Sequence, residues 1–151
     1  MDVYDASFFL STAWIGPFWF LMLVYPEEER TERAMQGPWF FIGPIVIWFA
    51  VTLSDPNALS DLFGDMMSSQ PLEALASLLG TKAGASAAWA HMVAGDIFVT
   101  RWIWRRSLEM GVDPWIRTSS VFFAVMLMPV GIAMHIALAR NTESNLSLIH
   151  I

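Results

Sequence analysis

The 151-residue chain contains no cysteine, which excludes disulfide-stapled scaffolds and thiolate metal sites. It is also poor in charge, because only 15% of its residues are Asp, Glu, Lys or Arg, against roughly 25% in soluble domains. Acidic residues outnumber basic ones, and the formal net charge of −6 argues against a nucleic-acid partner. The length suits one domain and no more.

The chain is correspondingly rich in apolar residues. Hydrophobic residues make up 56% of the chain and aromatic residues 14%, including eight Trp and eleven Phe. This composition indicates an integral membrane protein, and a very apolar soluble helical bundle is the alternative. The start, "MDVYDAS", is short and acidic and does not resemble a cleavable signal or transit peptide. We therefore expect the first membrane span to act as the insertion signal.

Four apolar stretches approach the length of about 20 residues that a transmembrane helix needs. They lie at about 7–25, 38–53, 83–104 and 118–139. We predict an all-α integral membrane four-helix bundle that forms a single domain over residues 1–145. Residues 146–151, "LSLIHI", match an in-frame translation of a transposase adapter used in some sequencing libraries. We interpret them as a non-native tail, with a natural apolar tail as the alternative.

The distribution of Lys and Arg predicts the orientation in the membrane, since connections on the inner side carry an excess of both. The first and third connections carry most of these residues, whereas the second carries only Lys82. The residues concerned are Arg30, Arg33, Arg105, Arg106 and Arg117. We therefore expect both termini on the outer side of a bacterial inner membrane or a plastid membrane.

The second connection, 54–82, is long for a helical bundle. It contains "LSDLFGDMM" and "PLEALASLLG", in which leucines recur at helical spacing. We predict one or two short amphipathic helices on the outer membrane surface. They are either a lid over a cavity or packing elements without a functional role.

The third stretch contains three ionisable residues, His91, Asp96 and Arg101. A charged side chain at the bilayer centre costs about 2.5–3.5 kcal/mol on insertion scales. The three are spaced by five residues, so successive side chains point about 140° apart around a helix and lie about 7.5 Å apart along it. Each group is therefore expected to face a different neighbour, and other helices must complete any site.

Polar residues of the other stretches are predicted to lie at a similar depth, in the outer half of the membrane. They are Ser11, Thr12, Thr52 and His135, while Pro17, Pro44 and Pro129 free backbone carbonyls near mid-span. One hypothesis is a single polar cavity that opens outward and is floored by Asp96 as a neutral acid. The alternative is a set of separate hydrogen bonds that lock the bundle.

Metal and cofactor sites are less well supported by the sequence. Two His and one Asp could form a facial triad, and His91 and His135 could ligate haem. Neither arrangement has a local motif, so no metal and no cofactor is expected.

The stretch "SAAWAHMVAGDIFVTRWIW", followed by "MPVGIAMH", resembles the abscisic-acid-deficient-four-like membrane family. The detailed likeness covers about 86–140, and the first half of the chain resembles the family mainly in architecture. Trp104 and Arg106 depart from it, because plant members have a tyrosine and an acidic residue there. The residues that carry the resemblance are Trp89, His91, Asp96, Ile97, Phe98, Arg101, Pro129, Val130, Gly131 and His135.

The resemblance implies a function, since plant members are needed for neoxanthin synthesis in plastids. The implied reaction isomerises an epoxy-xanthophyll to an allenic one, which needs an acid at the epoxide oxygen and a base for a carbon-bound proton. His91 and Asp96 are the candidate catalytic pair, and Trp89, Arg101 and His135 are candidate substrate-binding residues. A lipid bilayer and a carotenoid are the expected partners. A non-catalytic pigment-binding subunit and a structural membrane subunit are the alternatives.

Overall fold

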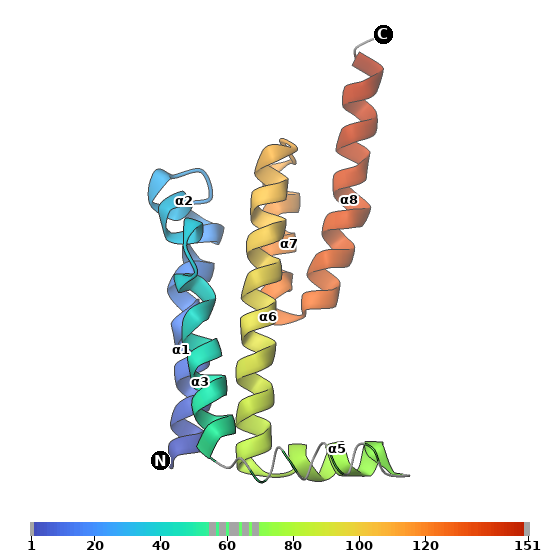
Figure 1. Cartoon of the computed structure of the whole chain (residues 1–151). Coiled ribbons are helices and arrows are strands. Elements are labelled where there is room, and N and C mark those ends of the chain that lie inside the picture. The colour runs from blue at the N-terminus through green and yellow to red at the C-terminus, as the bar shows by residue number, and fades with distance from the viewer. Residues whose placement is uncertain are drawn as a thin grey trace. The chain divides into compact units, whose positions relative to one another are not determined.

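The computed structural model describes residues 2–54, 57, 60, 64, 67 and 70–149, and their side chains as far as Ala139. Over these residues the chain is almost entirely helical and contains no strand, which confirms the all-α prediction (Figure 1). The helices are α1 (Val3–Val24), α2 (Glu29–Gln36), α3 (Trp39–Ser54), α5 (Pro71–Leu79), α6 (Lys82–Glu109), α7 (Pro114–Met126) and α8 (Met128–Ile149).

Proline and glycine separate most of these helices. Helix α1 ends just before Tyr25, and the proline that follows, Pro26, disfavours a helical conformation of Tyr25. Gly37 caps α2, and Gly80 caps α5. At Gly111 the backbone φ is +61°, a left-handed conformation that glycine adopts without steric cost and that lets the chain turn after α6.

The fourth apolar stretch is not one helix, so the prediction of a continuous helix over 118–139 is wrong. Helix α7 stops at Met126, Leu127 has φ −151° and ψ 80°, and α8 starts at Met128. The physical reason is Pro129, which has no N–H to donate to the carbonyl four residues earlier and whose ring would clash with it. At the start of a new helix this N–H is not needed, so Pro129 is well placed in the first turn of α8.

Two helical stretches are long and apolar enough to cross a membrane, judged by length and composition. They are Val3–Val24 and Glu29–Ser54, which correspond to the first two predicted spans. Met128–Ala139 is a shorter apolar helix. The predicted tail at 146–151 stays a prediction, because its side chains lie outside the described residues.

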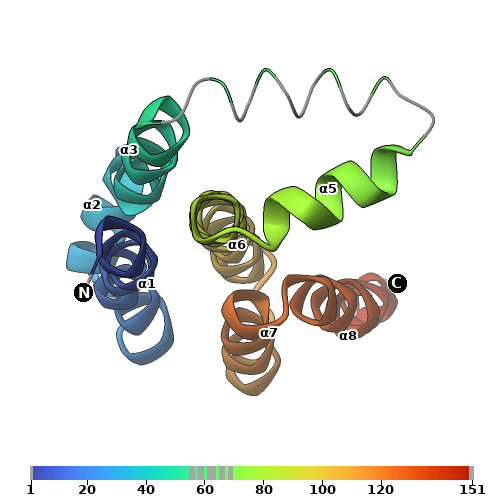
Figure 2. The same cartoon turned by 90° about the horizontal axis from the view of Figure 1, so that it is seen from below.

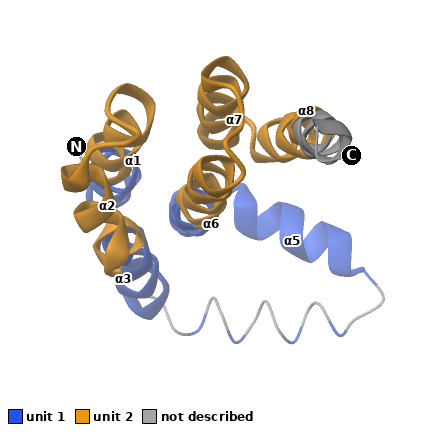
Figure 3. Cartoon of the chain, turned by 90° about the horizontal axis from the view of Figure 1, so that it is seen from above, with its two compact units in different colours: residues 1–14, 42–94 blue, residues 15–41, 95–151 orange. Residues whose placement is uncertain are grey.

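The contacts divide the chain into two compact units, and α1, α3 and α6 each contribute residues to both (Figure 3). Unit 1 comprises 1–14 and 42–94, and unit 2 comprises 15–41 and 95–151.

In unit 1 the start of α1 packs against the start of α6 through polar contacts. Ser86 Oγ donates to the Tyr4 carbonyl at 3.3 Å. Lys82 Nζ lies 2.6 Å from an Asp2 carboxylate oxygen and 3.3 Å from one of Asp5. These contacts fix the first turn of α1 beside the first turn of α6.

Helix α5 also belongs to unit 1 and lies crosswise to α6 beside the start of that helix (Figures 1 and 2). It buries none of its residues, and Leu72, Leu75 and Leu79 are exposed at helical spacing. The amphipathic helix expected from "PLEALASLLG" is therefore present. Most of the "LSDLFGDMM" segment lies outside the described residues.

In unit 2 the last part of α6 is followed by two antiparallel helices, and α7 lies beside both α6 and α8 (Figures 1 and 2). We call the end of this α7–α8 hairpin beside the α6–α7 connection its base and the end at Leu127 its tip. At the base, an apolar cluster is formed by Val112, Ile116 and Ala139. Near the tip, a side chain at Gly131 would collide with the backbone of Ala124. Glycine therefore allows the two helices to approach closely.

We expect Gly131→Ala to destabilise the protein by about 1–3 kcal/mol, because backbone atoms surround the new methyl group and cannot move aside independently. Gly95→Ala is the matched control, since an added Cβ there meets nothing within 4 Å and alanine favours a helix more than glycine does. Thermal unfolding of the purified protein measures both. Equal stability of the two variants would contradict the close approach of α7 and α8.

Candidate functional site

His91 lies on α6 within unit 1, and its side chain is exposed. Its ring faces the edge of Trp48 of α3, with centroids 6.4 Å apart and planes at 72°. The imidazole makes no hydrogen bond or ion pair with any residue that the structure describes. Its nitrogens are therefore available to a ligand.

Asp96 lies five residues further along α6, in unit 2, and is half-buried. Its backbone carbonyl accepts a hydrogen bond of 2.6 Å from Thr100 Oγ1. Its carboxyl group, in contrast, has no hydrogen-bond or ion-pair partner among the described residues. A half-buried carboxyl group without a partner is a candidate acid or base.

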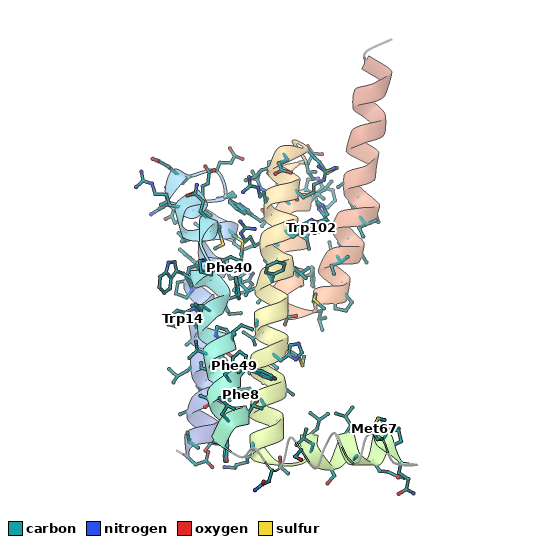
Figure 4. All side chains as sticks on the ribbon, viewed as in Figure 1. Phe8, Trp14, Phe40, Phe49, Met67 and Trp102 are labelled. Atoms are coloured by element: carbon teal, nitrogen blue, oxygen red, sulfur yellow. The ribbon has the colours of Figure 1, made fainter. Side chains whose placement is uncertain are left out.

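Arg101 is occupied by a structural contact. Its Nε donates to the Met35 carbonyl at 2.6 Å, and its guanidinium lies 5.3 Å from the centroid of the Phe40 ring. Figure 4 labels Phe40, which is buried. Arg101 thus connects α6 to the end of α2 and the start of α3.

Trp89 is occupied in a similar way within unit 1. Its indole N–H donates to Thr12 Oγ1 at 2.8 Å, and its ring stacks on Phe8 with centroids 4.7 Å apart. The indole therefore holds α6 against α1, and its donor is not available to a ligand.

His135 is buried in unit 2, with 2% of its surface exposed. Its Nδ1 lies 3.2 Å from Ser107 Oγ, and its ring meets the edge of Trp102 at 5.5 Å (Figure 4). Ser107 stands two residues before the end of α6 and sixteen residues, more than four turns, after His91. The prediction that His135 lies at the depth of His91 is therefore wrong.

The haem hypothesis relied on His91 and His135 lying at a similar depth, and the contact of His135 with Ser107 does not support that. No group of three or more metal-ligating side chains occurs in the described part of the chain.

The sequence analysis missed an ion pair of a buried arginine in unit 2. Arg117 of α7, expected in the third connection, is only 7% exposed, and its NH1 lies 3.0 Å from a carboxylate oxygen of the exposed Glu27. Arg117 Nε and Ser120 Oγ, one turn apart, are buried without a partner among the described atoms. A helical pattern that starts at Pro114 places Ser120 and Val121 on the same face as Arg117, and this pattern was the available signal in the sequence.

A hollow of about 200 Å³ lies in unit 2, beside the connection from α1 to α2 and the end of α6. Most of its lining is charged, which does not suit a long polyene. The lining residues are Pro26, Glu27, Glu28, Glu32, Trp104, Arg105, Leu108 and Glu109. It contains none of the five residues singled out by the sequence.

Comparison with known proteins decides the family. The family model described as ABA DEFICIENT 4-like matches residues 6–135. The chain belongs to the ABA DEFICIENT 4-like family. This confirms the resemblance carried by the motif in α6 and α8, and extends it to the first half of the chain.

A curated member of this family is similar over most of the chain. The protein ABA DEFICIENT 4, chloroplastic, of Arabidopsis thaliana is 25% identical over 136 residues, which cover 89% of this chain and 60% of that protein. The chain thus spans less than two thirds of that relative's length. No solved structure matches.

If Arg101 is a structural residue, Arg101→Gln should destabilise the protein by about 1.5–3 kcal/mol, the usual range for a hydrogen bond to a charged group. The control is Arg105→Gln, four residues along α6, which loses an exposed contact of 3.1 Å to Glu109 and should cost less than about 1 kcal/mol. Thermal unfolding distinguishes the two. A loss no greater at Arg101 than at Arg105 would show that the contact with Met35 contributes little.

Proposed function

We propose that this family member is a multi-pass integral membrane protein of carotenoid metabolism that isomerises an epoxy-xanthophyll. The observation that carries the proposal is the family match over residues 6–135, which includes His91 and Asp96. The role of plant members in neoxanthin synthesis, implied by the motif, supplies the substrate class.

Helix lengths support the membrane setting. Helix α1 has 22 residues and α6 has 28, so at 1.5 Å per residue they are about 33 and 42 Å long, against about 30 Å of hydrocarbon. With α3, these helices are the proposed spans. The arginine-rich connections after α1 and α6 belong on the inner side, and α5 and the N-terminus on the outer side.

The chemistry requires proton transfer without net oxidation or reduction. The C–O bond of the epoxide breaks, its oxygen takes a proton from an acid, and a base removes a carbon-bound proton so that a new C=C bond forms. Asp96 is the proposed acid and His91 the proposed base.

The contacts of the five candidate residues support this division of roles. Trp89, Arg101 and His135 are each committed to a partner in the fold, at 2.8, 2.6 and 3.2 Å. His91 and Asp96 have no hydrogen bond from their side chains within the described chain. A purely structural use of these five residues would be expected to pair the polar group of each, because an unpaired polar group in an apolar setting is costly.

A host that makes violaxanthin tests the proposal, and we expect neoxanthin only when the protein is present. Asp96→Asn keeps the shape but removes the acid, so conversion should fall about 10²–10⁴-fold while bound pigment is retained. The matched control is Asp113→Asn, at an exposed carboxyl whose side chain does not cap α7. Pigment extracted from cells and from the purified protein is the measurement.

The other outcomes decide between the remaining functions. Pigment bound by a protein that converts none of it would indicate a non-catalytic carotenoid-binding subunit. Absence of both binding and conversion would indicate a structural subunit, and unchanged conversion by Asp96→Asn would remove Asp96 from the mechanism.

A further inference from the structure

Helix α7, the first arm of the α7–α8 hairpin, is too short to cross a bilayer. Helix α7 has 13 residues and is therefore about 20 Å long, against about 30 Å of hydrocarbon. After the single residue Leu127 the chain reverses, and α8 runs back beside α7 within unit 2 (Figure 1).

Charged residues lie at the base of the hairpin and are absent from its tip. Residues 118–139 contain no Asp, Glu, Lys or Arg. At the base, in contrast, Arg117 pairs with Glu27, and Arg105 and Arg106 stand near the end of α6. A charged base and an uncharged tip match a bilayer that presents phosphate groups at its surface and hydrocarbon inside.

The tip of the hairpin exposes large apolar side chains. They are Phe122, Met126, Leu127 and Val130, with exposures of 42%, 51%, 58% and 40%. In hydrocarbon this surface has its natural partner, whereas in water it would be a contiguous apolar patch.

Leu127, the one non-helical residue between α7 and α8, has both of its backbone groups hydrogen-bonded within the chain. Leu127 N–H donates to the Phe123 carbonyl at 2.6 Å, and the Leu127 carbonyl accepts from Val130 at 2.8 Å and from Gly131 at 3.2 Å. Pro129 has no N–H to satisfy. Re-entrant segments at membrane depth need such internal partners for their non-helical backbone.

We propose that α7 and α8 form a re-entrant hairpin that enters the bilayer from the side of the α6–α7 connection and places its tip among lipid acyl chains. Residues that follow Ala139 then return to the side from which α7 entered. This topology has three crossings and differs from the four crossings expected from hydrophobicity. It rests on the membrane setting of the proposed function and is independent of the carotenoid chemistry.

The absence of native cysteine makes single-cysteine labelling in intact membrane vesicles a direct test. The variants are Ser77→Cys in α5, Asp113→Cys in the α6–α7 connection, Ser144→Cys, and Leu127→Cys at the tip, with Met126→Cys as a second tip variant. With a membrane-impermeant maleimide, Asp113→Cys and Ser144→Cys should label from one face and Ser77→Cys from the other. The tip variants should label only after detergent is added.

Each outcome decides for or against the hairpin. Labelling of Ser144→Cys from the face that labels Ser77→Cys would show that residues 118–139 cross the membrane, and would overturn the hairpin while leaving the proposed function intact. Labelling of both tip variants in intact vesicles would place the tip in water and overturn it as well. Extraction of the unmodified protein by alkaline carbonate would overturn the membrane setting itself, and with it the proposed function.

Discussion

Several polar side chains on α6 find hydrogen-bond partners on other segments of the chain, and an unpaired polar group in an apolar setting is costly. In unit 1, Ser86 and Trp89 bond to α1. In unit 2, Arg101 bonds to the Met35 carbonyl, Trp104 Nε1 donates to the Pro26 carbonyl at 3.0 Å, and Ser107 bonds to His135. Removing a partner from a buried donor costs about 1–3 kcal/mol, so these contacts hold neighbouring segments in register with α6.

This constraint distinguishes two kinds of ionisable or aromatic residue in the α6 motif. Trp89 and Arg101 are explained by their partners, since each fixes a neighbouring helix. His91 and Asp96 are not explained in this way, because their side chains have no hydrogen bond among the described residues. The fold therefore explains Trp89 and Arg101 but does not explain His91 and Asp96, the two groups that would serve as base and acid in an isomerase.

Hydrophobicity predicted the parts of the fold that depend on long uninterrupted apolar runs. The stretches 7–25, 38–53 and 83–104 correspond to α1, α3 and α6, with boundaries that differ by a few residues. Helix α2 was missed because its sequence, "ERTERAMQ", is strongly charged and an apolar window cannot detect it. The ion pair of Arg117 with Glu27 was missed because it joins segments 90 residues apart in the sequence.

The error at His135 has a single physical origin. Its depth was inferred by counting along 118–139 as if the chain ran in one direction. Pro129 interrupts the helix and the chain reverses at Leu127. Successive residues of α8 therefore lie progressively closer to the base of the hairpin. His135 thus meets Ser107 near the end of α6 rather than a residue near His91.

The same reversal gives a structural meaning to the second half of the family motif. Pro129 starts α8, Gly131 lets α8 approach Ala124, and His135 ties α8 to α6 through Ser107. These three residues are what a tight hairpin requires, and none of them needs a substrate to account for its presence. The case for chemistry therefore rests on α6 alone. There, a half-buried carboxyl at Asp96 without a partner is the feature that packing and hydrogen bonding do not explain.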